Sequence, residues 1–192
     1  MAHLLISVPA AATVTATDNC GTATVVMSSV TTAGNCPGNY TITRTWTATD
    51  QCGNTSSASQ TISVSDNTAP ILVGVPSNTT ASCSSVPAAA TVTATDNCGT
   101  ANVVMTETTT AGNCPGNYMI TRTWTATDQC GNTSSASQTI SVTDNTAPIL
   151  VGVPSNTSAS CTSLPAAATV TATDNCGTPT NIGAVLSDTL IV

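Results

Sequence analysis

Hydrophobic and polar residues alternate along most of this chain, with the two-residue period of β-strands. The longest such run is Tyr118–Thr127, where Ile, Arg, Trp and Ala alternate with threonine. Clusters of Gly, Pro, Asn and Asp separate the runs and mark turns, and no window shows the 3.6-residue period of a helix. In the middle of the chain the pattern predicts strands at Ile71–Val75 (bent at Pro76 and continuing toward Cys83), Ala90–Thr95, Val103–Thr109, Tyr118–Thr127 and Ala136–Val142.

The whole pattern recurs every 78 residues. Val8–Ser85 and Val86–Ser163 differ at only eight positions, and a third copy begins at Leu164. Five or six short strands per copy, with frequent turns, are typical of a Greek-key, immunoglobulin-like β-sandwich. We therefore expect an all-β fold of tandem sandwich repeats: an incomplete first repeat at 1–67, a complete second repeat at 68–145 and an incomplete third repeat at 146–192.

Strand direction sorts the loops of a repeat between two ends. We call the end at which a repeat begins its leading end and the opposite end its trailing end. If each strand reverses the direction of the previous one, the loops at Asp96 and Asp128 lie at the leading end, near Asp66. Cys83 and Cys114 then lie at the trailing end. The leading end is also where a repeat meets the preceding one.

Acidic residues concentrate in the loops that this scheme brings together. Three carboxylates in a small volume repel one another unless a cation compensates, and Ca²⁺ takes six to eight oxygen ligands from carboxylates, amides and carbonyls. The alternative is that each Asp only caps a turn by accepting backbone N–H groups. The candidate ligands are Asp18, Asp96 and Asp174 of the DNCG motifs, Asp50 and Asp128 of DQCGN, Asp66 and Asp144 of DNTAP, and Asn67 and Asn97 beside them.

Nine cysteines, four per repeat, predict a disulfide framework in an oxidising compartment. Zinc is disfavoured because CxxC pairs are absent. If bridges join cysteines at one end of a repeat, the pairs are Cys98–Cys130, Cys83–Cys114 and Cys20–Cys52. A sequential pairing remains open, with bridges at Cys83–Cys98, Cys114–Cys130, Cys36–Cys52 and Cys161–Cys176.

The composition of the chain excludes several classes of function. The chain has no lysine, two arginines and a net charge of −7, so it has no basic face for nucleic acid. Phe is absent and aromatic residues make up 2%, so the core is thin and needs covalent or metal staples. No apolar stretch approaches the roughly 18 residues of a membrane span.

Catalysis is not expected. The single histidine, His3, lies outside the repeats, so the repeated residues cannot form a Ser–His or Cys–His pair. Arg122 and Trp124 are two residues apart and share a strand face. They form either a sugar-binding platform, with Arg stacked on Trp, or simply core and core edge; Arg44 and Trp46 repeat the pair.

The run YxITRTWTATDQCGN, with DNCG upstream and DNTAP downstream, resembles the HYR-like, immunoglobulin-type repeats of large secreted surface proteins of Bacteroidetes. These include gliding-motility adhesins of the SprB kind. The resemblance covers nearly the whole chain. It implies extracellular β-sandwich repeats that act as stalks or adhesive fibres.

These observations lead to one main functional hypothesis and two alternatives. The main one is a structural segment of a secreted bacterial surface fibre or adhesin stalk, stabilised by disulfides and by Ca²⁺, whose partners are adjacent repeats. The first alternative is a module that binds glycans or a surface directly. The second is a self-assembling filament subunit, because the first copy lacks a counterpart of Thr68–Cys83 and a neighbour could donate the strand. A piece cut from a longer array explains the same pattern.

Overall fold

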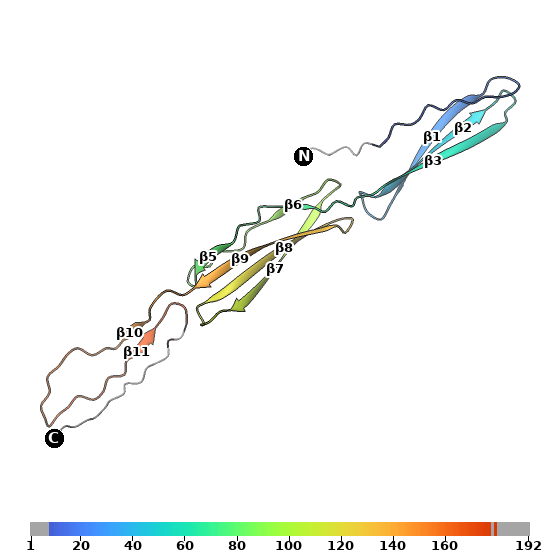
Figure 1. Cartoon of the computed structure of the whole chain (residues 1–192). Helices are drawn as coiled ribbons and strands as arrows, with labels where there is room; N and C mark the ends of the chain where they lie inside the picture. Colours follow the sequence, from blue (N-terminus) through green and yellow to red (C-terminus); the bar gives the residue numbers. More distant parts are fainter. Residues whose placement is uncertain (1–7, 178, 180–192) are drawn as a thin grey trace. The chain divides into compact units, whose positions relative to one another are not determined.

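A computed structural model describes residues 8–177 and residue 179. Every regular element among them is a β-strand, drawn as arrows in Figure 1. No helix in this part of the chain is long and apolar enough to cross a membrane. The strands form several sheets in a sandwich-like arrangement, and the prediction of an all-β fold is confirmed.

The first repeat contributes an antiparallel three-stranded meander of β1 (Thr24–Ala33), β2 (Tyr40–Thr49) and β3 (Thr55–Val64). Trp46 of β2 lies opposite Met27 on β1 and Ala58 on β3. Alternation of small apolar residues with threonine suits a pleated, half-buried surface. Most β1 and β3 side chains are exposed, so this sheet has little core of its own.

The complete second repeat has a four-stranded sheet in the order β5-β9-β8-β7 and a separate pair of β4 with β6. β5 runs parallel to β9, whereas β4 and β6 are antiparallel. In the third repeat, β10 pairs with β11. The strand bounds are β4 (Ile71–Val73), β5 (Thr79–Ser82), β6 (Thr93–Thr95), β7 (Ala101–Ala111), β8 (Tyr118–Asp128), β9 (Thr133–Thr143), β10 (Ile149–Val151) and β11 (Thr171–Thr173).

The expected single strand from Ile71 to Cys83 is wrong, because it is two strands in two different sheets. Gly74 between them has φ +85°, a conformation that favours glycine, and Pro76 follows two residues later. The predicted strand Ala90–Thr95 is shorter than expected, since only Thr93–Thr95 is paired. The three strands after it extend slightly beyond their predicted ends.

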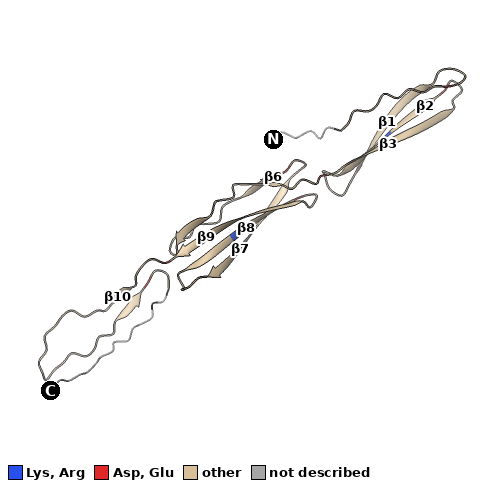
Figure 2. Cartoon of the chain, in the orientation of Figure 1, with Lys and Arg blue, Asp and Glu red and all other residues tan. Residues whose placement is uncertain are grey.

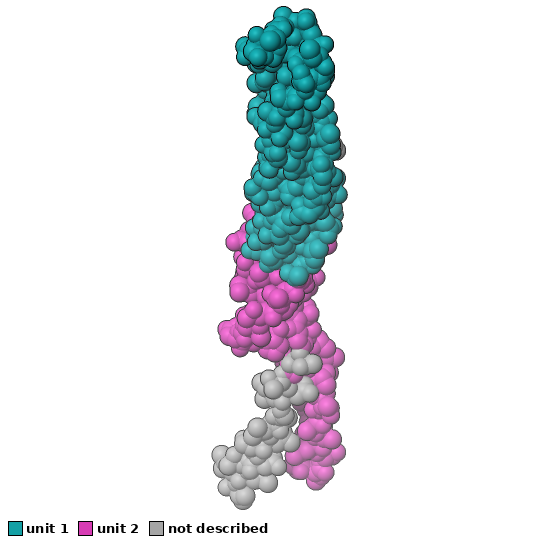
Figure 3. All heavy atoms as spheres, turned by 90° about the vertical axis from the view of Figure 1, so that its right-hand side faces the viewer, with its two compact units in different colours: residues 1–75, 90–106, 123–137 teal, residues 76–89, 107–122, 138–192 magenta. Residues whose placement is uncertain are grey.

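By compactness the chain divides into two units, coloured in Figure 3. Unit 1 comprises residues 1–75, 90–106 and 123–137, and unit 2 comprises residues 76–89, 107–122 and 138–192. Unit 1 buries Trp124, Ala126 and Val92. Unit 2 has a small core of Ile120, Ile140 and Val142, against which Ala81, Cys83, Val86 and Tyr118 pack.

Candidate functional site

Three carboxylates meet inside unit 1, where the first repeat passes into the second. Asp128 is the last residue of β8, Asp96 directly follows β6, and Asp66 lies two residues after β3. One carboxylate oxygen from each lies within 4.8 Å of the other two. These are the three residues that the strand-direction scheme places at the leading end of the second repeat.

The Asp128 carboxylate is held by its own loop. Oδ1 accepts the backbone N–H groups of Cys130 and Asn132, both at 2.8 Å, and Oδ2 accepts Asn132 Nδ2 at 2.7 Å. Burial pushes the pKa of Asp128 upward, but these hydrogen bonds outweigh burial and hold the pKa below its usual value. Asp128 is therefore ionised at neutral pH.

Asp66 is positioned by the loop between β1 and β2. Its backbone N–H donates to Asn39 Oδ1 at 2.7 Å, and its own Oδ1 accepts the N–H of Thr68 at 3.1 Å. Gly38 lies against it so closely that a Cβ there would be 2.6 Å from Asp66 Cβ. Asn132 Nδ2 also donates to the Asp66 carbonyl at 3.2 Å, which ties the second repeat to this turn.

Two buried oxygens at the site have no hydrogen-bond partner, Oδ1 of Asp96 and Oδ1 of Asn97. Asp96 Oδ2 accepts the backbone N–H of Cys98 at 2.8 Å. Burial raises the pKa of the Cys98 thiol, and the charges of the three aspartates raise it further. Because unpaired buried oxygens are costly, these two are available to a ligand with positive charge.

Among the residues that the structure describes, no basic side chain compensates the three carboxylates. Arg44 on β2 and Arg122 on β8 are the only basic residues besides His3 (Figure 2). Arg44 donates to the carbonyls of Pro9 and Ala10 and to Gln60 Oε1. Arg122 donates to the Pro87 carbonyl at 2.9 Å and pairs with Glu107 at 2.7 Å.

The other predicted ligands form two-carboxylate versions of the site. In unit 1, Asp18 and Asp50 line a cavity of about 200 Å³. In unit 2, Asp144 and Asp174 line a cavity of about 130 Å³. Asn67, which was also predicted, is exposed and donates to Ser65 Oγ instead.

The cysteine pairing corrects both sequence-based schemes. The structure forms Cys36–Cys130, with a Cα–Cα distance of 5.2 Å, and Cys83–Cys176, with a Cα–Cα distance of 5.8 Å. Neither predicted scheme forms among the described residues. The absent bridges are Cys98–Cys130, Cys83–Cys114 and Cys20–Cys52, together with the four sequential ones. The unbonded cysteines are Cys20, Cys52, Cys98, Cys114 and Cys161.

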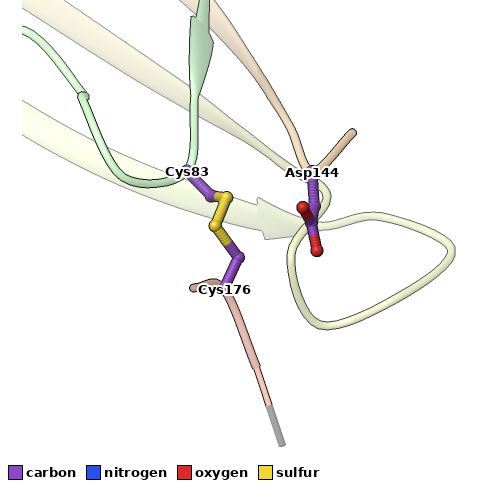
Figure 4. Close-up of side chains that lie close together, drawn as sticks. All are labelled: Cys83, Asp144 and Cys176. Carbon is purple, nitrogen blue, oxygen red and sulfur yellow. A yellow bond between two sulfur atoms is a disulfide. The ribbon is translucent and has the colours of Figure 1, made fainter. Parts of the chain in front are cut away.

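Both predicted schemes fail because they pair cysteines within one repeat, whereas each observed bridge crosses a repeat boundary. Cys36 at the trailing end of the first repeat joins Cys130 at the leading end of the second, and Cys83 joins Cys176 in the same sense. Asp144 lies beside Cys83 and Cys176 (Figure 4), but those sulfurs are bonded to each other, so neither is a thiolate ligand for a metal.

The predicted Arg–Trp platform is not displayed in the second repeat. Trp124 is 2% exposed and Arg122 is 5% exposed, so the pair belongs to the core and its edge. In the first repeat Trp46 is half-buried and Arg44 is buried.

Sequence reasoning missed the residues that fix the junction turns. Asn39 Oδ1 accepts the N–H of Asp66, and Asn117 Oδ1 accepts the N–H of Asp144, both at 2.7 Å. Gly116 approaches Asp144 as closely as Gly38 approaches Asp66. The available signal is the repeated motif GNCPGN, a cluster of turn residues at 34–39 and 112–117.

A family model described as "HYR-like domain with 4 cysteines" matches the chain in two tandem segments, residues 5–64 and 73–142. No curated protein matches the chain. The second matched segment contains four cysteines, Cys83, Cys98, Cys114 and Cys130, and the first contains three, Cys20, Cys36 and Cys52.

Proposed function

Because the chain belongs to the family of HYR-like domains with four cysteines, we propose that it is a structural segment of a secreted surface fibre or adhesin stalk. The family and the disulfides together indicate an extracellular, adhesion-type repeat module. The proposal adds the stalk role, in which disulfides and Ca²⁺ fix consecutive repeats to one another. The resemblance to SprB-kind repeats supports a bacterial cell surface as the location.

The single observation that carries the proposal is that both disulfides of the described residues join different repeats. A bridge within one repeat would constrain that repeat alone. A bridge between repeats keeps one repeat attached to the next when the chain is pulled. This is the property that a load-bearing stalk requires.

Calcium is proposed for the cluster in unit 1, since the donors there fit a hard cation. Asp66, Asp96 and Asp128 would supply carboxylate oxygens, and Asn97 Oδ1 lies unpaired beside them. The cation would neutralise three like charges that no basic side chain of residues 8–177 compensates. It would thereby stiffen the turn that connects β3 to β4.

Thermal stability measured in chelator and in millimolar Ca²⁺, under non-reducing conditions, tests the calcium role. We expect Ca²⁺ at a hundredfold excess over its Kd to raise Tm by about 5 °C or more. Asp96→Asn should abolish most of the shift. Asp18→Asn is the matched control, since Asp18 has the same DNCG context but lies outside the three-carboxylate cluster. An equal Tm in chelator and Ca²⁺ would remove calcium from the proposal.

Single-molecule stretching tests the stalk role independently of calcium. Oxidised molecules should withhold from extension the segment between Cys36 and Cys130, which have a sequence separation of 94. Reduction should release it, at roughly 3.6 Å per residue. Equal contour lengths before and after reduction would contradict the role of the bridges.

A second candidate, direct binding of a glycan or a surface, is favoured by β7, an edge strand of its sheet. Four of the eight differences between copies fall on β7, at Asn102, Thr106, Glu107 and Thr108, and all four side chains are exposed. Exposed substitutions concentrated on one edge strand suit a displayed binding surface. Glycan-array binding that is lost when these four residues are changed to Thr24, Ser28, Ser29 and Val30 of the first copy would support this candidate.

A further inference from the structure

The two disulfides interleave along the chain. Cys83 lies between Cys36 and Cys130 in the sequence, and Cys130 lies between Cys83 and Cys176. Two bridges that followed one another without overlap would close two separate loops. Interleaved bridges instead close two loops that share the residues between Cys83 and Cys130.

The interleaving divides the chain between Cys36 and Cys176 into three backbone segments. Each segment has one end at the Cys36–Cys130 bridge and the other end at the Cys83–Cys176 bridge. Cys83 lies at the midpoint between Cys36 and Cys130, and Cys130 lies almost at the midpoint between Cys83 and Cys176, so the segments are nearly equal in length. The three segments are residues 36–83, 83–130 and 130–176.

The Cys36–Cys130 bridge is held by contacts of its own unit. Both cysteines belong to unit 1. The Cys36 carbonyl accepts the N–H of Asn39 at 3.0 Å, and Cys130 donates its N–H to Asp128 Oδ1 at 2.8 Å. The two turns that carry this bridge are therefore shaped without help from the other bridge.

The Cys83–Cys176 bridge is held in the same way within unit 2. Cys83, directly after β5, donates its N–H to the Thr143 carbonyl at the end of β9, at 3.3 Å. Cys176 donates its N–H to Asp174 Oδ1 at 3.1 Å. Each bridge can therefore form when the other is missing.

We propose that the two bridges form a redundant limit on extension. When pulling opens the folded units, either bridge alone holds the chain between Cys36 and Cys176 to the length of one segment. Both bridges together make all three segments carry the force side by side. The chain lengthens beyond one segment only after both bridges have been reduced. This inference rests on the covalent connections and not on the proposed stalk role.

The length limit follows from the shortest covalent path. Force applied at the chain ends enters at Cys36 and leaves at Cys176. With the Cys36–Cys130 bridge alone, the path crosses that bridge and continues along segment 130–176. With the Cys83–Cys176 bridge alone, the path runs along segment 36–83 and then crosses the bridge. In both cases the rest of the chain is an unloaded loop, so the second bridge shortens the path no further.

The second bridge instead changes the stiffness of the opened chain. With both bridges intact, the three segments connect the same two points and are stretched together. An unfolded segment behaves as a flexible coil that resists extension entropically, and three equal coils in parallel require about three times the force of one at the same extension. A molecule with two bridges is therefore stiffer than a molecule with one, but not shorter.

Release of the chain consumes two molecules of a dithiol reductant such as dithiothreitol. At each bridge, one thiolate of the reductant attacks a protein sulfur, forms a mixed disulfide and releases the first protein thiol. The second thiolate of the reductant then closes its own cyclic disulfide and releases the other protein thiol. Each bridge gains two electrons and two protons, which the reductant loses.

The test is single-molecule stretching of the full chain by its ends, with unbonded thiols blocked by N-ethylmaleimide. Wild type, Cys36→Ser and Cys83→Ser should have the same contour length to within about one residue, roughly 3.6 Å. The double variant Cys36→Ser/Cys83→Ser should be longer by the sequence separation of one bridge, 93 or 94, and not of two. Cys161→Ser, which removes an unbonded cysteine, should match wild type.

The force at a given extension gives a second readout. Between the bridges, wild type should need about three times the force of either single-bridge variant; the flanking parts of the chain are the same in all molecules. If a variant does not fold, partial reduction of wild type supplies single-bridge molecules, which peptide mapping identifies. A longer contour in either single-bridge form, or equal stiffness of wild type and both, would overturn the proposal. Either result leaves the stalk role standing, since that role requires only that full reduction lengthens the chain.

Discussion

Cys36 and Cys130 are 94 residues apart in the sequence, yet their Cα atoms lie 5.2 Å apart and their sulfurs are bonded. The bond attaches the loop after β1 in the first repeat to the loop after β8 in the second. It lies next to the cluster of Asp66, Asp96 and Asp128, so covalent and electrostatic features share one junction.

Removal of the junction bridge should destabilise the chain strongly. Cys130→Ser should lower the free energy of unfolding by about 3–4 kcal/mol, since the bridge closes a long loop in the unfolded chain. Cys52→Ser is the matched control, because Cys52 has the same DQCGN context but is unbonded and exposed. Urea denaturation under non-reducing conditions measures both. Equal losses in the two variants would contradict the pairing found here.

The two tryptophans should differ in how much each contributes to the free energy of unfolding, although their sequence contexts are the same. Trp124 is 2% exposed, whereas Trp46 is half-buried. Trp124→Ala should lower the free energy of unfolding by about 3–5 kcal/mol. Trp46→Ala should lower it clearly less. If Trp124→Ala does not fold, acrylamide quenching of Trp46→Phe gives the answer, since the remaining Trp124 should be shielded. Equal effects, or a freely quenched Trp124, would contradict its burial.

The hydrogen bond from Arg122 to the Pro87 carbonyl should contribute more to stability than the ion pair of Arg122 with Glu107. Glu107 is 42% exposed in its side chain, so Glu107→Ser should cost only about 0.5–1 kcal/mol. Arg122→Met keeps an apolar stem but leaves a carbonyl and a carboxylate unpaired, and should cost about 1–3 kcal/mol.

The first repeat supplies the reciprocal experiment. Ser29 lies opposite Arg44 and replaces the glutamate of the second repeat. Ser29→Glu should therefore stabilise the chain, or leave its stability unchanged. Denaturant midpoints rank the stabilities of the three variants. A larger loss of stability in Glu107→Ser than in Arg122→Met would show that the ion pair, and not the Pro87 carbonyl, contributes more.

The Asp50 turn predicts a pH dependence. Hydrogen bonds, first that from the Asn54 side chain, lower the pKa of Asp50 below its usual value. A carboxylate with a lowered folded-state pKa stabilises the fold above its unfolded pKa of about 3.9, and this contribution is lost as pH falls through the folded value. Asn54→Ala should therefore reduce Tm at pH 7 and make little difference near pH 2. A Tm deficit that is constant over this range would contradict the mechanism.

The strands were predictable where burial on one face dictates the sequence. On β8 the buried residues Ile120, Arg122, Trp124 and Ala126 alternate with more exposed ones, and this alternation can be read directly from the chain. The break between β4 and β5 was not predictable, because it depends on each half finding a different partner strand.

The junction was predictable only in part. Strand direction brings Asp66, Asp96 and Asp128 to one end of a repeat, and the structure places them there. The bridges were predicted wrongly because each repeat was treated as self-contained. A pairing that reaches from one copy to the next leaves no local spacing pattern, since every copy contains all four cysteines. The roles of Asn39 and Asn117 were also hidden, because they act on backbone groups 27 residues away.

The placement of the bridges also affects how the chain responds to proteolysis. The connecting segments 66–70 and 144–148 lie inside the loops closed by Cys36–Cys130 and Cys83–Cys176, respectively. A protease that cuts either segment therefore releases no fragment, because the severed pieces stay tethered through sulfur. A nicked molecule separates into fragments only after its disulfides have been reduced.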